Sequence, residues 1–380
     1  MNWWSGRQLS NAAFLWPALV ATATAEAMRA TAELVALGTE VEPAPAPPEP
    51  CGTTASEVVR DLPSVRLRDY GAGLGAVPGR ATLICAPLAL HGAVVADLAP
   101  GHSLVEVLRS AGIGRLFLAD WRSASVDMAN LRIDDYLATL NVLVDDIGGP
   151  VDLIGLCQGG WLALVYAARF PAKVRRLVIA GAPVDPSAQP SDLSQLAVAT
   201  PSSVFQGFVD AGGGRVLGRT ISSFWGADTL DSGDALRALQ LAEAGATADF
   251  AAAKAAYDAW NEWTIDLPGS FYLEVIEKLY KGNDLAGGRF VALGERIDLS
   301  RLRLPIYCLA GADDHVVAPQ QVLAVRRLVA TPPEQLRSAV APGGHLSLFM
   351  GRETLGREWP EIVRWLKDDG AVDTMSAAAS

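Results

Sequence analysis

The chain has 380 residues, of which 50% are hydrophobic and 19% are charged, and its formal net charge at pH 7 is −11. This length and apolar fraction allow one elaborated domain with a large buried core. The acidic balance argues against a protein that binds nucleic-acid phosphates or an anionic membrane surface. The four cysteines, Cys51, Cys85, Cys157 and Cys308, lack the spacing of a metal site. We therefore expect reduced thiols in a cytoplasmic protein that holds neither metal nor cofactor.

Residues 1–40 are predicted to form an N-terminal helical arm, and residues 41–53 a proline-rich linker. The arm begins with an apolar stretch, but Pro17 interrupts it and charged residues follow. A transmembrane helix needs about 20 clean apolar residues, so we predict no transmembrane segment. The aromatic residues of the arm, such as Trp3 and Trp4, are expected to pack on the core or on a second copy in a homodimer. A hydrophobic granule surface is the alternative partner.

The body of the chain alternates short apolar runs with helical patterns, which indicates a mostly parallel sheet flanked by helices. Strands are expected at residues 81–86, 115–119, 151–154, 176–180, 305–309 and 337–340. We predict that residues 54–185 and 300–368 build this α/β core and that residues 186–299 form a helical cap inserted into it. Such a cap would exclude water and shape a substrate pocket. Residues 369–380 are expected to be a flexible tail.

Residues 151–170 carry the pattern that is most informative about chemistry. An apolar run ends in G-L-C-Q-G-G, from Gly155 to Gly160, and passes directly into a helical pattern. This order is typical of a nucleophile elbow, a strained strand-to-helix turn that presents a nucleophile at the carboxyl edge of a sheet. Close packing in the turn explains the glycines. The alternative is that Cys157 is a small buried hydrophobic residue.

Two later segments supply the partners that a cysteine nucleophile needs. Asp313 and Asp314 follow the strand expected at 305–309, and His345 lies in a glycine turn after the strand expected at 337–340. The order nucleophile, acid, histidine is that of alpha/beta-hydrolases. His345 would take the thiol proton, and Asp314, or Asp313 as the second choice, would orient the imidazole. The alternative for His345 is an ordinary loop histidine.

A site for acyl transfer also needs hydrogen-bond donors for the oxyanion. We expect the backbone N–H of Gln158 to be one donor, and that of Leu88 or Ala89, after the first strand of the core, to be the other. Attack by the thiolate forms an acyl-cysteine, which is itself a thioester. This favours acyl transfer or thioester substrates without excluding hydrolysis.

Several blocks between about residue 80 and residue 365 resemble the poly(3-hydroxyalkanoate) synthases and the intracellular poly(3-hydroxyalkanoate) depolymerases. The blocks are L-A-P-G-H-S-L-V from 98, D-W-R from 120, I-D-D-Y-L from 133, G-L-C-Q-G-G from 155 and A-G-A-D-D-H-V-V from 310. The resemblance implies an alpha/beta-hydrolase fold with Cys157 as nucleophile, Asp314 as acid and His345 as base. It also implies a substrate of the 3-hydroxyacyl class, whether an ester, a polyester or an acyl-CoA.

The blocks resemble both branches of this group. G-H-L-S-L-F-M-G-R from 344 and L-P-G-S-F-Y-L-E from 267 are similar to the depolymerases, whereas the G-G of the elbow resembles the synthases. We therefore favour hydrolysis of 3-hydroxyacyl esters or thioesters by an enzyme like an intracellular depolymerase or a thioesterase. A synthase that polymerises 3-hydroxyacyl-CoA is the alternative, and an inactive granule-associated protein is the third hypothesis. Trp161, His315 and Trp225 are expected to contact the substrate.

Overall fold

The structure is a computed structural model that describes residues 47–71, 79–225 and 248–368, without the side chains of Ser223, Trp225 and Ala248. The predicted arm, the first part of the linker and the tail lie outside the described residues, so the expected packing on a second copy or a granule does too.

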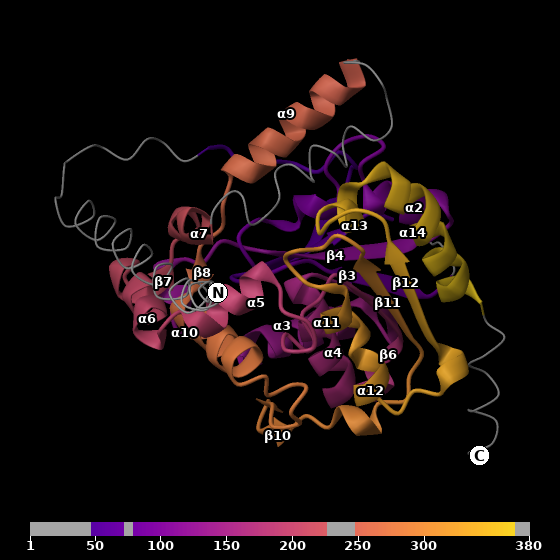
Figure 1. Ribbon diagram of the computed structural model, residues 1–380. Helices are drawn as coiled ribbons and strands as arrows, with labels where there is room; N and C mark the ends of the chain where they lie inside the picture. Colours follow the sequence, from indigo (N-terminus) through magenta and orange to yellow (C-terminus); the bar gives the residue numbers. More distant parts are fainter. Residues whose placement is uncertain (1–46, 72–78, 226–247, 369–380) are drawn as a thin grey trace, which may run out of the picture. The chain divides into compact units, whose positions relative to one another are not determined.

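The core is an eight-stranded sheet with the strand order β1-β2-β4-β3-β5-β6-β11-β12 (Figure 1). β2 runs antiparallel to both of its neighbours, and the remaining pairs are parallel. The strands are β1 (Glu57–Leu62), β2 (Val65–Asp69), β3 (Ala81–Cys85), β4 (Arg115–Trp121), β5 (Val151–Leu156), β6 (Val174–Ala180), β11 (Ile306–Gly311) and β12 (Leu336–Ala341). The predicted α/β fold is confirmed, and the hairpin of β1 and β2 adds two strands that the sequence did not predict.

Continuous apolar sequence marks the middle of the sheet. Every residue of β3, β5 and β11 is buried, because helices cover both faces of the parallel part. β1 lies at an edge, and all of its residues except Leu62 are exposed. The carboxyl ends of β3, β5 and β11 therefore meet at one edge of a rigid layer, where ligands bind in open α/β sheets.

Helices form a layer on each face of the sheet (Figure 1). α3 and α4 cover one face, and α2 and α14 pack together on the other. The helices of the core are α2 (Leu104–Ser110), α3 (Ile133–Ile147), α4 (Gln158–Arg169), α11 (Pro319–Leu323), α12 (Val325–Leu328), α13 (Ser347–Met350) and α14 (Arg352–Lys367). Among the described helices, none has both the length and the apolar composition needed to cross a membrane.

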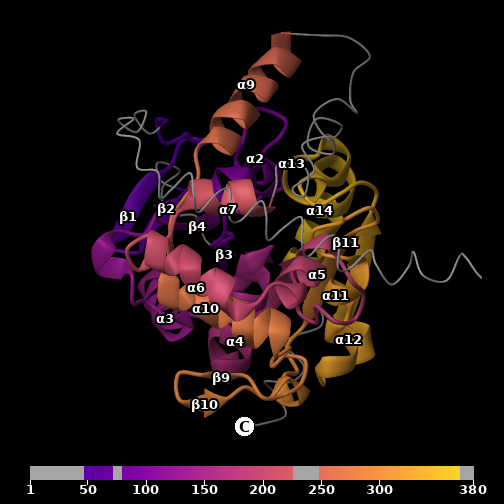
Figure 2. The same cartoon turned by 60° about the vertical axis from the view of Figure 1, so that its left-hand side comes forward.

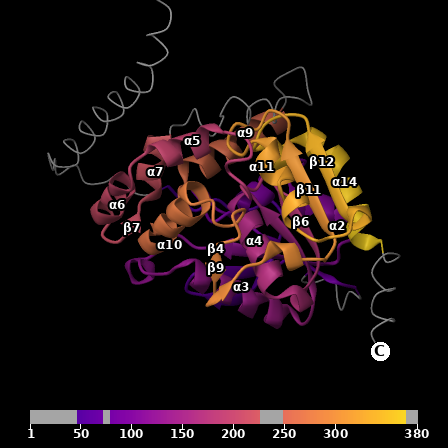
Figure 3. The same ribbon diagram turned by 60° about the horizontal axis from the view of Figure 1, so that its bottom comes forward.

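The segment between β6 and β11 is mostly helical. Its elements are α5 (Asp192–Ala199), α6 (Ser202–Ala211), β7 (Arg215–Val216), α7 (Gly218–Trp225), α9 (Ala248–Glu262), β8 (Leu267–Pro268), α10 (Gly269–Glu274), the π-helical turn η4 (Val275–Lys281), β9 (Val291–Ala292) and β10 (Glu295–Arg296). α5, α6, α7 and α10 gather to one side of the main sheet (Figures 1 and 3), and α6 contacts α10 (Figure 2).

Aromatic side chains hold this helical segment together. Phe208 contacts Phe205 and Phe224 edge-on, at centroid distances of 6.5 and 5.0 Å.

A hydrogen bond joins this segment to the core. Glu274 of α10 accepts it from the backbone N–H of Ile133 at 3.0 Å and so caps the first turn of α3. The helical segment is thus anchored to the core through a helix start.

Candidate active site

Cys157 lies in the turn between β5 and α4, with φ of 50° and ψ of −121°. A residue other than glycine in this left-handed region costs on the order of 1–3 kcal/mol, so the surroundings must hold it there. Its N–H donates to the carbonyl of Ala180 in β6 at 2.9 Å, and its own carbonyl accepts from Gly160 at 2.8 Å. The thiol is thus presented at the carboxyl edge of the sheet by a fixed backbone.

Two glycines make this turn sterically feasible. A Cβ at Gly159 would lie 2.5 Å from the carbonyl oxygen of Ala86 and closer still to that of Cys85. A Cβ at Gly155 would lie 2.5 Å from the Cα of Gly160. The start of α4 therefore packs directly on the backbone that follows β3, which brings the loop after β3 next to Cys157.

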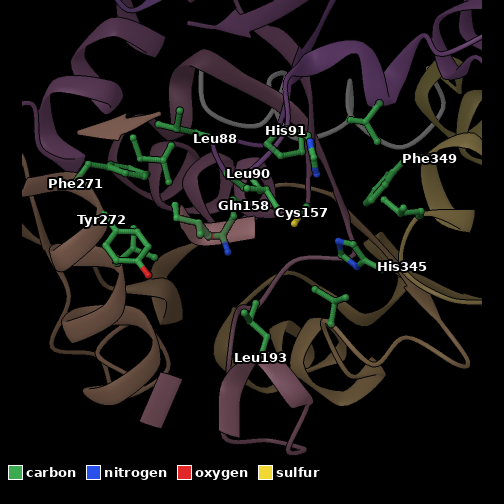
Figure 4. Close-up of a pocket in the computed structure, with 18 of the residues that line it drawn as sticks. Leu88, Leu90, His91, Cys157, Gln158, Leu193, Phe271, Tyr272, His345 and Phe349 are labelled. Atoms are coloured by element: carbon green, nitrogen blue, oxygen red, sulfur yellow. The ribbon is translucent and has the colours of Figure 1, made fainter. Parts of the chain in front are cut away.

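His345 lies in the loop after β12 and reaches the same place as Cys157 (Figure 4). Its Nδ1 is 2.7 Å from Oδ2 of Asp314, and both side chains are buried. The other carboxylate oxygen of Asp314 accepts the N–H groups of Val316 at 2.9 Å and Val317 at 2.7 Å. The carboxylate is therefore fixed on one side by backbone donors and on the other by the imidazole.

The electrostatics of His345 favour a cationic ring. Burial by itself would lower its pKa, but the charges of Asp314 and then Cys157, together with hydrogen bonding to both, raise the pKa of His345 well above its ordinary value. With Nδ1 facing the carboxylate, the buried Nε2 is the ring nitrogen left to face Cys157. This ring is arranged to exchange a proton on the Cys157 side.

Cys157 lines a pocket of about 150 Å³ (Figure 4). Its walls are mostly apolar and come from both the core and the helical segment between β6 and β11. Lining side chains include Leu88 and Leu90 from the loop after β3, Leu193 of α5, Ile221 of α7, Phe271 of α10 and Phe349 of α13. An acyl chain attached to Cys157 would therefore be surrounded by carbon atoms.

The two predicted oxyanion donors lie beside this pocket. Gln158 is the first residue of α4, so its N–H has no acceptor within the helix. Leu88 is buried and lines the pocket. Neither backbone N–H has an acceptor among the described residues. The side chain of Gln158 turns elsewhere: its Nε2 donates to the hydroxyl of Tyr280 at 2.9 Å.

Two of the expected substrate contacts do not line the pocket. Trp161 is fully buried along α4, where its Nε1 donates to Oε1 of Gln158 at 2.5 Å and its ring packs on Phe290. His315 is exposed, because the turn that wraps the backbone of Val316 around the Asp314 carboxylate directs the intervening residue to solvent. The side chain of Trp225 lies outside the described residues.

The structure also separates the two adjacent acids. Asp314 is buried against His345, whereas Asp313 is exposed and its N–H donates to the carbonyl of Gly343 at 3.1 Å. That backbone bond joins the loop after β11 to the loop that carries His345. Asp313 thus contributes to the site through its backbone.

Sequence reasoning missed His91, which lines the pocket together with Cys157 and is buried. Its Nδ1 lies 3.3 Å from the carbonyl oxygen of Trp263, and its ring contacts that of Trp260 in α9 in a tilted arrangement, with the centroids 4.4 Å apart. The signal was its place in the loop after β3, only three residues beyond the expected oxyanion donor Leu88.

Comparison with known proteins bears on this arrangement. Residues 120–351 match the family described as alpha/beta hydrolase fold. The poly(3-hydroxyalkanoate) polymerase subunit PhaC of Synechocystis sp. is 30% identical over 299 residues, covering 72% of this chain and 74% of that protein. The protein of the same name from Haloferax mediterranei is 27% identical over 341 residues, covering 85% of this chain and 66% of that protein. The chain thus spans about two thirds to three quarters of these two relatives.

Among solved structures, a variant of an epoxide hydrolase from Bacillus megaterium is similar, with a TM-score of 0.51 and 14% identity over 81% of this chain and 99% of that chain. At this identity the likeness concerns the fold alone. The two PhaC proteins are more informative, since their amino-acid sequences align with most of this chain. The chain belongs to the alpha/beta hydrolase fold family and, within it, to the family of the poly(3-hydroxyalkanoate) polymerase subunits.

Proposed function

We propose that the protein is an acyltransferase that polymerises 3-hydroxyacyl groups, taken from coenzyme A thioesters, through an acyl-cysteine at Cys157. The observation that carries this proposal is the buried pair of His345 and Asp314, which shares an apolar pocket with Cys157 on a strained elbow. The relatives supply the substrate class, since they are named for poly(3-hydroxyalkanoate) polymerisation.

This proposal favours polymerisation, which the sequence alone placed second, over hydrolysis, which the sequence alone placed first. The preference rested on blocks around His345 and in the segment from 267, which resemble depolymerases. The curated relatives that share 22–30% identity with the chain are named as polymerases. The pocket is compatible with this choice, because apolar walls keep water away from an acyl-cysteine until an alcohol arrives.

The first half-reaction loads the enzyme. The Cys157 thiolate attacks the thioester carbonyl, and the carbonyl oxygen becomes an oxyanion that accepts from the N–H groups of Gln158 and Leu88. The tetrahedral intermediate collapses, the bond to the coenzyme A sulfur breaks, and the His345 imidazolium donates its proton to the leaving thiolate. One thioester replaces another, so the step is close to balanced in energy.

The second half-reaction transfers the acyl group to a 3-hydroxyl. His345 takes the proton of the attacking hydroxyl through Nε2, while Asp314 orients the ring and stabilises its positive charge. The new ester forms as the bond to the Cys157 sulfur breaks, and the thiolate is restored. Each cycle consumes one acyl-CoA, releases one coenzyme A and lengthens the acceptor by one unit.

Intact-protein mass spectrometry after brief exposure to 3-hydroxybutyryl-CoA tests this function. We expect a covalent 3-hydroxybutyryl adduct, its absence in Cys157→Ala, free coenzyme A and, on longer incubation, insoluble polyester. A Cys51→Ser background removes the exposed thiol at the surface. Release of coenzyme A with free 3-hydroxybutyrate as the sole product would show a hydrolase instead. No adduct and no release would exclude both enzymatic readings for this substrate.

A further inference from the structure

His91 brings a polar atom into a pocket that is otherwise almost entirely carbon. It is buried, lines the pocket with Cys157 and follows Leu88, the proposed oxyanion donor, by three residues. In the view of Figure 4, Cys157 lies between the rings of His91 and His345. An acyl group bound to Cys157 would therefore share the pocket with two imidazoles, that of His345, whose pKa is raised, and that of His91, whose pKa is lowered.

The contacts of His91 define its tautomer. Because the carbonyl oxygen of Trp263 only accepts, Nδ1 at 3.3 Å must carry the proton. Burial lowers the pKa of His91 to about 4, against the effect of the carbonyls of Trp263 and Trp260, so the ring is neutral at physiological pH. A neutral ring that donates from Nδ1 offers a lone pair on Nε2, and no described residue donates to that atom.

Two other polar side chains of the pocket face partners of their own. The Gln158 amide donates to Tyr280 and accepts from Trp161. His345 faces Asp314 on one side and the thiol on the other. Among the described residues none donates to Nε2 of His91, and His91 lines the same pocket as the sulfur that would carry the acyl group.

Building on the proposed function, we propose that His91 is a specificity-determining residue whose Nε2 accepts a hydrogen bond from the 3-hydroxyl of the acyl group on Cys157. A 3-hydroxyacyl group carries its two oxygens on the first and third carbons. The loop after β3 would bind both: the carbonyl oxygen at the N–H of Leu88 and the hydroxyl at His91. A plain acyl group would leave the acceptor unsatisfied.

The contacts of His91 with Trp260 and Trp263 keep the ring in place. The ring packs at a tilt against Trp260, whose own Nε1 donates to the carbonyl of Gly92 at 3.2 Å. The neighbouring carbonyl of Leu90 accepts the N–H of Ile265 at 3.0 Å. His91 is therefore fixed from both sides before substrate binds, which is what discrimination by a single hydrogen bond requires.

The test compares acylation by 3-hydroxybutyryl-CoA with acylation by butyryl-CoA, which lacks the hydroxyl, using coenzyme A release and adduct mass. We expect the wild-type protein to prefer the hydroxylated substrate by roughly ten- to hundredfold in the second-order rate constant. In His91→Phe, which keeps an aromatic ring on Trp260, the ratio of the two rate constants should fall close to one. His91→Gln, which restores an acceptor oxygen, should recover part of the ratio.

The outcomes separate this inference from the proposed function. Equal acylation of the wild-type protein by both substrates would overturn the role of His91 while leaving the acyl-cysteine chemistry intact, and this arm needs no variant to fold. A His91→Phe protein that slows equally with both substrates would show that the ring only supports the loop. No adduct with either substrate would instead refute the proposed function.

Discussion

The four cysteines occupy three environments. Cys85 and Cys308 lie within strands, and burial raises the pKa of each thiol to about 12, so both stay protonated at neutral pH. Cys51 is exposed, and Cys157 is half-buried in the pocket. An alkylating reagent at neutral pH should therefore label Cys51 and Cys157 and leave the other two.

In a Cys51→Ser background the rate of iodoacetamide labelling then reports on Cys157 alone. In the proposed mechanism His345 stabilises the thiolate, so we expect His345→Ala to slow labelling at pH 7 by about tenfold or more. Peptide mass spectrometry with time gives the rate. An unchanged rate would mean that the thiol does not depend on the ring, and would favour the inactive-protein hypothesis.

Asp314→Asn should cost about 10⁴-fold in kcat, because an amide neither holds the correct tautomer nor stabilises the imidazolium. Asp313→Asn is the matched control, and its kcat should stay close to that of the wild type, since that side chain is exposed. Coenzyme A release measures both. Equal losses in the two variants would contradict the pairing of Asp314 with His345.

The raised pKa of His345 also makes stability depend on pH. The folded protein holds the His345 proton more tightly than the unfolded chain, so this stabilisation is complete below the unfolded pKa of about 6.5 and is lost as pH rises through the raised value. The difference in free energy of unfolding between wild type and Asp314→Asn should therefore be larger at pH 6 than at pH 9. Urea titrations at the two pH values measure it, and a difference that grows with pH would refute the assignment.

For single residues, the types and the order of the catalytic candidates could be predicted from the sequence, but the directions in which their side chains point could not. Cys157, an acid and His345 follow from the strand ends that carry them. Which of two adjacent aspartates points inward depends on the turn that lets Val316 and Val317 donate to one carboxylate, and no pattern encodes that. His91 was overlooked because its role depends on Trp260 and Trp263, which are about 170 positions away.

Among the elements, the contact between α4 and β3 depends on the absence of a side chain at Gly159. Gly159→Ala would place a methyl group against the carbonyls of Cys85 and Ala86, and we expect a loss of about 1–3 kcal/mol in the free energy of unfolding. Gly356→Ala in α14 is the matched control: its added Cβ meets no atom within 4 Å, and helix propensity should stabilise the protein by about 0.5–1 kcal/mol. Denaturant titration compares them, and similar effects would contradict the close approach.

The elements that escaped prediction share a physical reason. β1 and β2 form an edge hairpin rich in charged residues, such as Arg66 and Arg68, so they lack the apolar runs that identify the central strands. The pairs β7–β8 and β9–β10 have two residues per strand, too few for a recognisable apolar run. β7 and β8 pair across a long stretch of chain, whereas β9 and β10 form a local hairpin. The buried parallel strands were predictable because burial on both faces requires continuous apolar sequence.

Across the described part of the molecule, the end of α9 and the loop after β3 form one hydrogen-bonded unit. Trp260→Phe removes the indole donor to Gly92, and we expect amide exchange at Ile265 and Val95, which donate to Leu90 and Gly92 of this loop, to speed up roughly five- to tenfold together. Trp365→Phe, in α14 against Tyr307, is the control and should leave these amides unchanged. Hydrogen exchange with mass spectrometry detects the change, and a response at Ile265 alone would show that the two segments move separately.

The walls of the pocket could not be predicted from the sequence. Its walls come from Leu88, Leu193, Phe271 and Phe349, which no periodicity connects. Each of these is also an ordinary apolar residue of its own element. Only the packing of the helical segment over the strand ends brings them together, and that packing depends on contacts between side chains far apart in the sequence.

The size of this pocket bears on the length distribution of a polyester made there. A cavity of about 150 Å³ is large enough for benzene, which has as many non-hydrogen atoms as a 3-hydroxybutyryl group. A pocket of this size contacts the terminal unit of the polymer and makes no contact with the units that precede it. Addition should then proceed at the same speed on short and long polymers, and molecules initiated together should end with a narrow dispersity.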